Sequence, residues 1–161
     1  MNEKRAQRYS IVEAALCDVF GIEPNGIKPF QARIRHLRSI GVPNLPRSGS
    51  GKWIEYSFDQ ILEVAFALCL QRYGVTPRIA AEMGPAIAKT VGWMGAGSHH
   101  ENDVYIILEP SKSSSLSCEF VPGLDLLKRK IDARCEDDAL LIMNASSLVR
   151  KIEQALSKER N

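Results

Sequence analysis

The stretch Ala32–Gln60 reads ARIRHLRSIGVPNLPRSGSGKWIEYSFDQ, and it decides how the chain is expected to fold. Its first part predicts a short basic helix, because three apolar residues recur at spacings of three and form a stripe on one side. Gly41 is expected to end this helix, and Pro43 prevents it from restarting. The residues of the predicted stripe are Ile34, Leu37 and Ile40.

Pro46 and Arg47 come next, followed by the small, flexible run Ser48–Gly51. The next piece, Lys52–Tyr56, is rich in aromatic and β-branched residues and predicts a strand behind a glycine-containing hairpin tip. Ser57 with Gln60 three residues later predicts a capping box that opens the next helix. The predicted order is helix, β-hairpin, helix, with cations on the first helix and on the hairpin, which is the order of a winged helix-turn-helix.

Ile34–Val42 (IRHLRSIGV) resembles the end of the recognition helix in MerR-type transcription regulators. Pro46-Arg47, a glycine and then Tyr56-Ser57 before an apolar helix are similar to the wing of that family. Leu68–Ile79 resembles the helix–glycine–helix that follows the wing. The resemblance covers roughly residues 12–83, about half of the chain, and it implies a bacterial DNA-binding regulator.

The sequence departs from the MerR pattern in three places. The paired tyrosines usual in the recognition helix are His36 and Leu37 here, and the wing sequence from Gly51 to Tyr56 is one residue longer than usual. MerR proteins carry a long antiparallel dimerisation helix after this module, and this sequence does not continue with one.

Positive charge is concentrated in the segment that resembles the recognition helix and wing. The chain as a whole has a net charge of +2. Between Pro24 and Ile54 there are six Lys or Arg residues and no Asp or Glu, whereas from Glu55 onward Asp and Glu outnumber Lys and Arg. A basic patch on one element is the electrostatic footprint of a nucleic-acid binder. A solvated basic face is the alternative interpretation.

The candidate DNA-binding residues lie on the predicted helix and hairpin. An arginine can form two hydrogen bonds with guanine in the major groove, so we expect side chains of the helix to read bases. The small tip, with its backbone amides and flanking cations, is expected to hold phosphate oxygens. Changing Arg35 and Arg38 together to Ala is expected to abolish specific binding. The candidates are Lys28, Arg33, Arg35, His36, Arg38, Arg47, Ser48 and Lys52.

The segment before the basic helix predicts the first helix of the motif over Ile11–Phe20, ended by the glycine that follows. Ser10 with Glu13 predicts a capping box at its start. Residues 1–8 are polar and are expected to fray. The basic helix itself should begin near Lys28-Pro29, because proline is tolerated in a first helical turn.

The helix predicted over Phe58–Tyr73 is apolar nearly all round, which is typical of a helix at the centre of a core or one shared with a partner subunit. Thr76-Pro77 predicts the start of another helix. Gly84-Pro85 lies inside that helix and is expected to bend it or divide it in two.

The C-terminal part predicts a small sheet with helices. Its strands are expected over 104–109, 117–121 and 139–143, and its helices over 124–133 and 148–158, the second capped by Ser146 or Ser147. Lys128-Arg129-Lys130 reads as a solvated face or as a second DNA contact. The predicted fold class is α+β: a MerR-like winged-helix DNA-binding domain over 1–92, a linker over 93–102, and a small α+β domain for dimerisation or sensing over 103–161.

Several classes of site lack their motifs. None of the four cysteines lies in a C-x-x-C pair, so we expect free thiols. His99-His100 has no third ligand nearby, so no metal is predicted. No phosphate-binding glycine motif, H-E-x-x-H or G-x-S-x-G is present, so we predict neither catalytic residues nor a cofactor. No run of ~18 apolar residues and no signal peptide are found, which predicts a cytoplasmic, nucleoid-associated protein without membrane contact.

The sequence therefore predicts a sequence-specific regulator that binds double-stranded DNA as a homodimer, because one short helix reads few base pairs. RNA polymerase or another regulator is a further candidate partner. A different class of function is a protein-interaction adaptor that uses a winged-helix scaffold without binding DNA. A third is a small enzyme with its site around His99, His100 and Asp103.

Overall fold

The computed structural model describes residues 6–45, 54–94, 103–110, 116–134 and 140–159. Within these residues the chain forms six α-helices, one 3-10 helix and two small antiparallel sheets, which confirms the predicted α+β class. The chain divides into two compact units, residues 1–92 with 151–161 and residues 93–150. Of the predicted linker, only Trp93 and Met94 lie inside the described residues.

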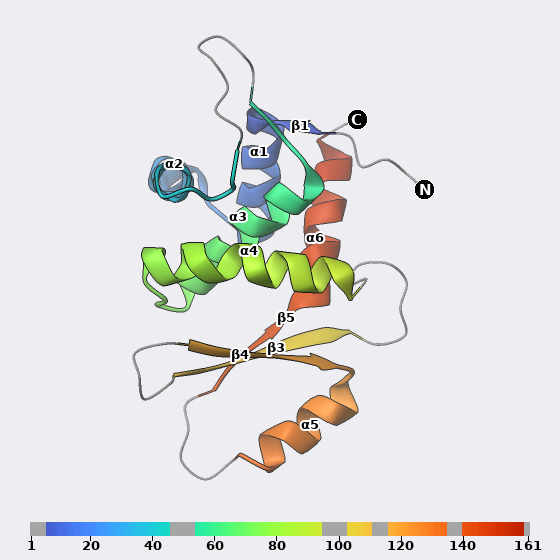
Figure 1. Ribbon diagram of the computed structural model, residues 1–161. Helices are drawn as coiled ribbons and strands as arrows, with labels where there is room; N and C mark the ends of the chain where they lie inside the picture. The colour runs from blue at the N-terminus through green and yellow to red at the C-terminus, as the bar shows by residue number, and fades with distance from the viewer. Residues whose placement is uncertain (1–5, 46–53, 95–102, 111–115, 135–139, 160–161) are drawn as a thin grey trace. The chain divides into compact units, whose positions relative to one another are not determined.

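The first unit is mainly helical (Figure 1). Its elements are β1 (Gln7–Arg8), α1 (Tyr9–Phe20), the 3-10 helix η1 (Pro24–Gly26), α2 (Ile27–Ser39), β2 (Glu55–Tyr56), α3 (Phe58–Arg72), α4 (Pro77–Trp93) and the end of α6 (Ala145–Lys158).

Helix α3 forms the centre of this unit. The predicted capping box is confirmed: the Gln60 backbone amide donates to Ser57 Oγ at 3.2 Å, and the Ser57 amide donates to Gln60 Oε1 at 2.9 Å. Nine residues of α3 are buried, on every side of the helix, which agrees with its apolar sequence. They are Ile61, Leu62, Val64, Ala65, Phe66, Ala67, Leu68, Cys69 and Leu70.

Helix α4 runs as one helix through Gly84-Pro85, so of the two predicted alternatives, a bend or a division in two, the division is not found. The reason lies in its packing against α3. A Cβ atom added at Gly84 would come within 2.9 Å of both the Ala67 Cβ and the Glu63 backbone oxygen. The glycine therefore allows the backbones of the two helices to approach closely, and this packing holds the helix together where Pro85 removes a backbone hydrogen bond.

Gln7 and Arg8 form a strand, β1, that was not predicted from the sequence. Strand β1 pairs antiparallel with β2, so that Gln7 lies opposite Tyr56 and Arg8 opposite Glu55. The expectation of fraying is therefore wrong for Gln7 and Arg8. Because this pairing holds the chain up to Arg8, helix α1 begins at Tyr9, and Arg8 occupies the N-cap position without a side-chain cap. The predicted Ser10 capping box is not formed.

The end of α1 follows the prediction: Gly21 adopts φ 60°, ψ 45°, and its amide bonds back to the last turn of the helix. Of the predicted wing, the structure describes the short strand β2, whose partner is β1. Residues 46–53, where the hairpin tip is predicted, lie outside the described residues.

The second unit contains the sheet that the sequence predicts. Its elements are β3 (Val104–Pro110), β4 (Leu116–Pro122), α5 (Leu124–Asp132), β5 (Leu141–Asn144) and the first residues of α6. The strand order is β4-β3-β5, and both pairs are antiparallel. Helix α5 packs on one face of the sheet through a buried cluster of Ile107, Val121 and Leu127.

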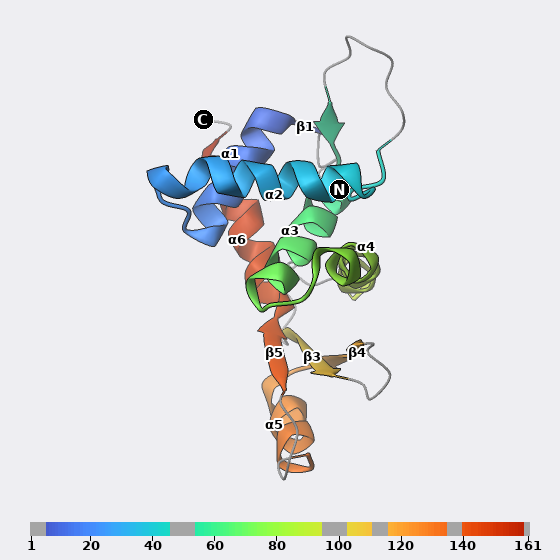
Figure 2. The same cartoon turned by 90° about the vertical axis from the view of Figure 1, so that its left-hand side faces the viewer.

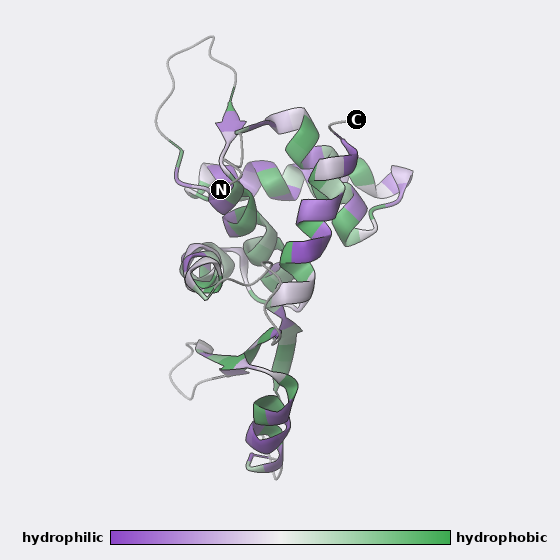
Figure 3. Cartoon of the chain, turned by 90° about the vertical axis from the view of Figure 1, so that its right-hand side faces the viewer, coloured by the Kyte–Doolittle hydropathy of each residue, from purple (hydrophilic) through white to green (hydrophobic). Residues whose placement is uncertain are grey.

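Helix α6 begins at Ala145, three residues earlier than predicted, and neither Ser146 nor Ser147 caps it. Instead the Ser147 amide donates to Asn144 Oδ1 at 2.8 Å, so the last residue of β5 serves as the cap. Ser146 Oγ accepts a hydrogen bond from the Val104 amide at 2.9 Å. Figure 3 shows green and purple bands alternating along α6, as expected for an amphipathic helix. None of the helices in the described parts of the chain is long and apolar enough to cross a membrane.

Candidate nucleic-acid interface

Helix α2 lies on the outside of the first unit (Figure 2). Three apolar residues attach it to the core, and each is at most 4 % exposed: Phe30, Ile34 and Leu37. The prediction placed Ile40 in this stripe, but Ile40 is 42 % exposed because the helix ends at Ser39. Phe30, one turn before Ile34, contributes the third buried residue, and its ring packs at a tilt against Phe20 of α1 with ring centroids 5.8 Å apart.

The predicted cations of α2 occupy different sides of the helix. Successive residues are turned by about 100° about the axis, so Lys28 and Arg35 share the face opposite the buried stripe, and His36 lies on the solvent side about 80–100° further round the helix. All three side chains are exposed. Arg33 and Arg38 fall on opposite flanks of the helix, and Arg38 is half-buried whereas Arg33 is exposed.

The outward cations of α2 are not neutralised by the residues that the structure describes. Helix α2 contains no Asp or Glu. Among the ion pairs formed between described residues, none involves Lys28, Arg33 or Arg35. An incoming polyanion could therefore pair with these side chains without first breaking an ion pair to any residue that the structure describes.

Arg38 faces helix α1 instead. Its Cζ lies 5.5 Å from the centroid of the Tyr9 ring, within cation–π range. The Tyr9 ring also contacts Tyr56 of β2, with centroids 6.2 Å apart. Burial raises the pKa of Tyr9 to about 12, with a further contribution from the hydrogen bond that its hydroxyl donates to Glu13. Arg38 thus contacts the fold itself, on the flank next to Arg35, which it follows by three residues.

The sequence analysis missed the residues that hold α2 in place. Glu13, which it assigned to a capping box, accepts a hydrogen bond from Gln31 Nε2 of α2 at 2.5 Å. Gln31 and Arg38 are seven residues apart, so both lie on the flank of α2 that faces α1. This spacing is visible in the sequence, but their partners on α1 are not.

Arg47, Ser48 and Lys52, the predicted contacts of the wing, lie outside the described residues. The structure describes the chain on both sides of them. Before the segment, the Asn44 backbone oxygen accepts a hydrogen bond from Gln60 Nε2 at 3.3 Å. After it, β2 pairs with β1.

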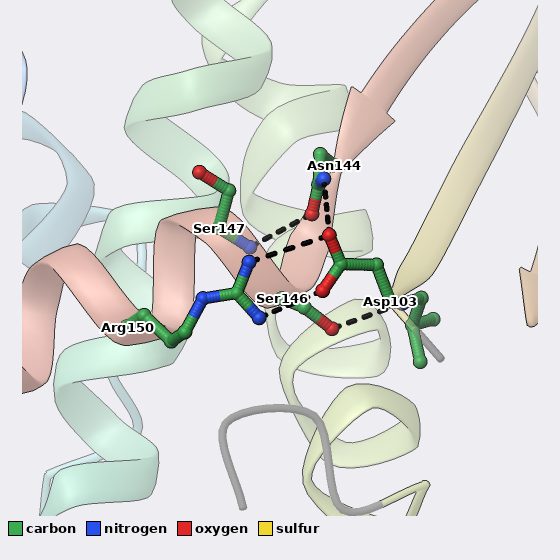
Figure 4. Close-up of polar contacts among 6 residues, drawn as sticks. Asp103, Asn144, Ser146, Ser147 and Arg150 are labelled. Atoms are coloured by element: carbon green, nitrogen blue, oxygen red, sulfur yellow. Dashed lines mark hydrogen bonds and ion pairs between the residues drawn. The ribbon is translucent and has the colours of Figure 1, made fainter. Parts of the chain in front are cut away.

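A polar cluster in the second unit surrounds Asp103 (Figure 4). Arg150 donates to the Asp103 carboxylate from Nη1 at 2.7 Å and from Nη2 at 3.3 Å, and Asn144 Nδ2 donates to it at 3.0 Å. Hydrogen bonds from Arg150 and then from Asn144 lower the pKa of Asp103. Through these hydrogen bonds Asp103, just before β3, connects that strand to the end of β5 and the first turns of α6. His99 and His100, the other residues of the enzyme hypothesis, lie outside the described residues.

The basic residues of α5 differ from those of α2 because part of their charge is neutralised. Lys130 Nζ lies 2.6 Å from Glu119 Oε1. Arg134, just after the helix, bridges Glu109 at 2.7 Å and Glu119 at 2.6 Å. The hydrogen bonds from Lys130 and Arg134 lower the pKa of Glu119. Lys128 and Arg129 are exposed.

The described residues contain neither a cluster of metal-ligating side chains nor a disulfide. No group of three or more His, Cys, Asp or Glu residues there could hold a metal ion. Cys17, Cys69 and Cys118 are free thiols, as predicted, and Cys135 lies outside the described residues. Burial raises the pKa of Cys69 and of Cys118 to about 11 each, so both thiols stay protonated at neutral pH.

No protein-family model matches the chain, and no curated protein matches it significantly. The resemblance of residues 12–83 to MerR-type regulators therefore stays a prediction.

Proposed function

We propose that this chain is a sequence-specific transcription regulator that binds double-stranded DNA through a MerR-like winged helix-turn-helix, with α2 as the recognition helix. One observation carries the proposal. Helix α2 presents Lys28 and Arg35 on its outward face, contains no carboxylate, and forms no ion pair there with any described residue. Such a surface matches a polyanion in both charge and accessibility.

The dimensions of α2 suit the major groove. A helix of 13 residues is about 20 Å long and about 10–12 Å across with its side chains, close to the width of the groove. In this proposal Arg35 and His36 face base edges, and Lys28 and Arg33 contact phosphates on either side. Each phosphate that a cation neutralises releases counterions, so binding should weaken steeply as salt is added.

The remaining parts of the proposal follow the sequence analysis. Arg47, Ser48 and Lys52 of the wing contact the sugar-phosphate backbone. A homodimer places two recognition helices on neighbouring half-sites, which raises both affinity and specificity. The second unit serves dimerisation or sensing, RNA polymerase or another regulator is a further partner, and the protein acts in the cytoplasm at the nucleoid.

The test is duplex binding by the full chain as a function of salt. We expect the wild-type protein to bind a fluorescently labelled pool of random-sequence duplexes with a logarithmic salt slope that is clearly negative. The double variant Lys28→Ala/Arg33→Ala, which removes both proposed phosphate contacts of α2, should lose about two units of this slope and about a hundredfold in affinity at low salt. Circular dichroism checks that the variant stays folded.

Two outcomes would contradict the proposal. If the double variant binds as the wild type does, α2 is not the contact element. If the wild-type protein shows no salt-dependent duplex binding, the protein-interaction adaptor becomes the better hypothesis, since an adaptor needs no affinity for phosphate.

A further inference from the structure

Tyr9 stands where three elements of the first unit meet. It is the first residue of α1, directly after β1, and its half-buried ring has two neighbours from other elements. Arg38 of α2 lies over the ring at 5.5 Å, and Tyr56 of β2 lies 6.2 Å away between centroids. A single side chain therefore touches both the last turn of the basic helix and the strand that follows residues 46–53.

A second contact holds α2 one turn further along α1. Glu13 follows Tyr9 by four residues and so lies on the same face of α1. It accepts the hydrogen bond from Gln31 at 2.5 Å and the one from the Tyr9 hydroxyl. Along α2, Gln31 and Arg38 are about 10 Å apart, or two turns. Helix α2 is thus attached to α1 at two polar points as well as through its apolar stripe.

The two kinds of attachment constrain α2 differently. Phe30, Ile34 and Leu37 bury the helix, but dispersion and burial are not directional and tolerate a small rotation about the helix axis. A hydrogen bond and a cation over a ring have preferred geometries. Because the polar contacts lie on the flank between the buried stripe and the solvent, a rotation of α2 in either direction would break them.

We propose that Tyr9, supported by Glu13, is a positioning residue that fixes the rotation of α2 and thereby decides which cations face the duplex. The inference rests on the proposed DNA-binding function. It assigns Tyr9 no contact with DNA, and it assigns Arg38 to the Tyr9 contact instead of to base reading. Selectivity between sequences should then depend on Tyr9, whereas the number of cations that meet phosphate should not.

The experiment compares Tyr9→Ala with Tyr9→Phe, Glu13→Ala and the control Tyr73→Ala, which removes a tyrosine that is 54 % exposed at the end of α3. The full chain is tested on a duplex that the wild-type protein enriches from a random pool and on the unselected pool. We expect Tyr9→Ala to lower the affinity ratio of the two duplexes by about three- to tenfold, with an unchanged salt slope. Tyr9→Phe keeps the ring over Arg38 and should stay within about twofold of the wild type.

Amide hydrogen exchange of α2, measured on the same proteins without DNA, tests the positioning directly. Faster exchange of α2 in Tyr9→Ala and Glu13→Ala, but not in Tyr73→Ala, supports the proposal. Wild-type selectivity together with wild-type exchange in Tyr9→Ala would overturn it. If the wild-type protein binds no duplex at all, the proposed function fails, and the exchange data alone then decide whether Tyr9 positions α2.

Discussion

Helices α2 and α5 are both short and basic and both carry exposed cations, but in the described residues part of the positive charge of α5 is paired with a carboxylate. The outward cations of α2, Lys28 and Arg35, form no ion pair with any residue that the structure describes. On α5 the cation Lys130 is paired with Glu119 of β4, and the nearby Arg134 is paired with both Glu119 and Glu109 of β3.

The difference comes from what lies beneath each helix. Helix α5 packs on a sheet in which Ile107 lies directly opposite Glu119. Glu109, two residues after Ile107, is therefore a diagonal neighbour of Glu119, and both side chains lie on the face that α5 covers. Helix α2 packs on other helices through Phe30, Ile34 and Leu37, and the α1 carboxylate that meets its flank, Glu13, accepts a hydrogen bond from Gln31 and pairs with no cation of α2. In these two helices, exposed basic residues stay available to a polyanion where no carboxylate of the supporting layer pairs with them.

The difference between α2 and α5 is tested most strongly by reversing one charge on each helix. We expect Arg35→Glu to lower duplex affinity by about ten- to hundredfold, because it removes one cation and places a repelling charge on the outward face of α2. Arg129→Glu on α5 should leave affinity within about twofold of the wild type. Both affinities are measured by fluorescence anisotropy at the same salt concentration. Equal losses in the two variants would show that the two helices do not differ in function.

Removing a carboxylate from the sheet should make α5 more like α2. In Glu119→Gln, Lys130 and Arg134 lose their shared partner, and we expect a loss of stability of about 0.5–1 kcal/mol, since these side chains are 29–39 % exposed and solvent screens the pairs. The freed cations should also make nonspecific duplex binding more salt-dependent. Chemical denaturation and salt titration measure the two effects.

The matched control for this variant is Glu82→Gln on α4. Glu82 pairs with Arg78 at 3.4 Å, and both side chains are largely exposed, so no measurable change is expected. A destabilisation of the same size in both variants would mean that the Glu119 network contributes no more than an ordinary surface pair.

The smallest expected effect is the pH dependence of the second unit. The folded-state pKa values of Glu119 and Asp103 lie below their ordinary values of 4.5 and 3.8, because cations donate hydrogen bonds to both carboxylates. The resulting stabilisation is fully present above those ordinary values and is lost as the pH falls through the lowered ones. Denaturation curves between about pH 6 and about pH 3 should therefore depend less on pH in Glu119→Gln than in the wild type. An unchanged pH dependence would contradict this explanation.

The elements that the sequence predicts well depend on neighbours within a few residues. The Ser57–Gln60 capping box, the end of α1 at Gly21 and the buried core helix α3 all follow from short-range patterns. The three strands of the second sheet are likewise present close to where they are predicted. Short-range patterns failed where equivalent choices competed: Asn144, Ser146 and Ser147 are all good capping residues, and the end of β5 selects Asn144.

In the candidate site, too, some features could be predicted from the sequence and others could not. That α2 is a basic helix without carboxylates could be read from the sequence, because composition and periodicity are properties of one segment. Three contacts could not be read from the sequence: Arg38 over the Tyr9 ring, Glu13 with Gln31, and β1 with β2. Each of these contacts joins residues that are many positions apart, and their meeting depends on how the helices pack.

By itself, then, the sequence determined where the helices and strands form and where positive charge accumulates, since backbone geometry and side-chain periodicity act over a few residues. Only the tertiary structure decided which of those charges remain unpaired. Whether a cation is neutralised depends on carboxylates and aromatic rings that distant parts of the chain bring within a few ångströms of it, and at that distance the interaction depends on packing and not on sequence separation.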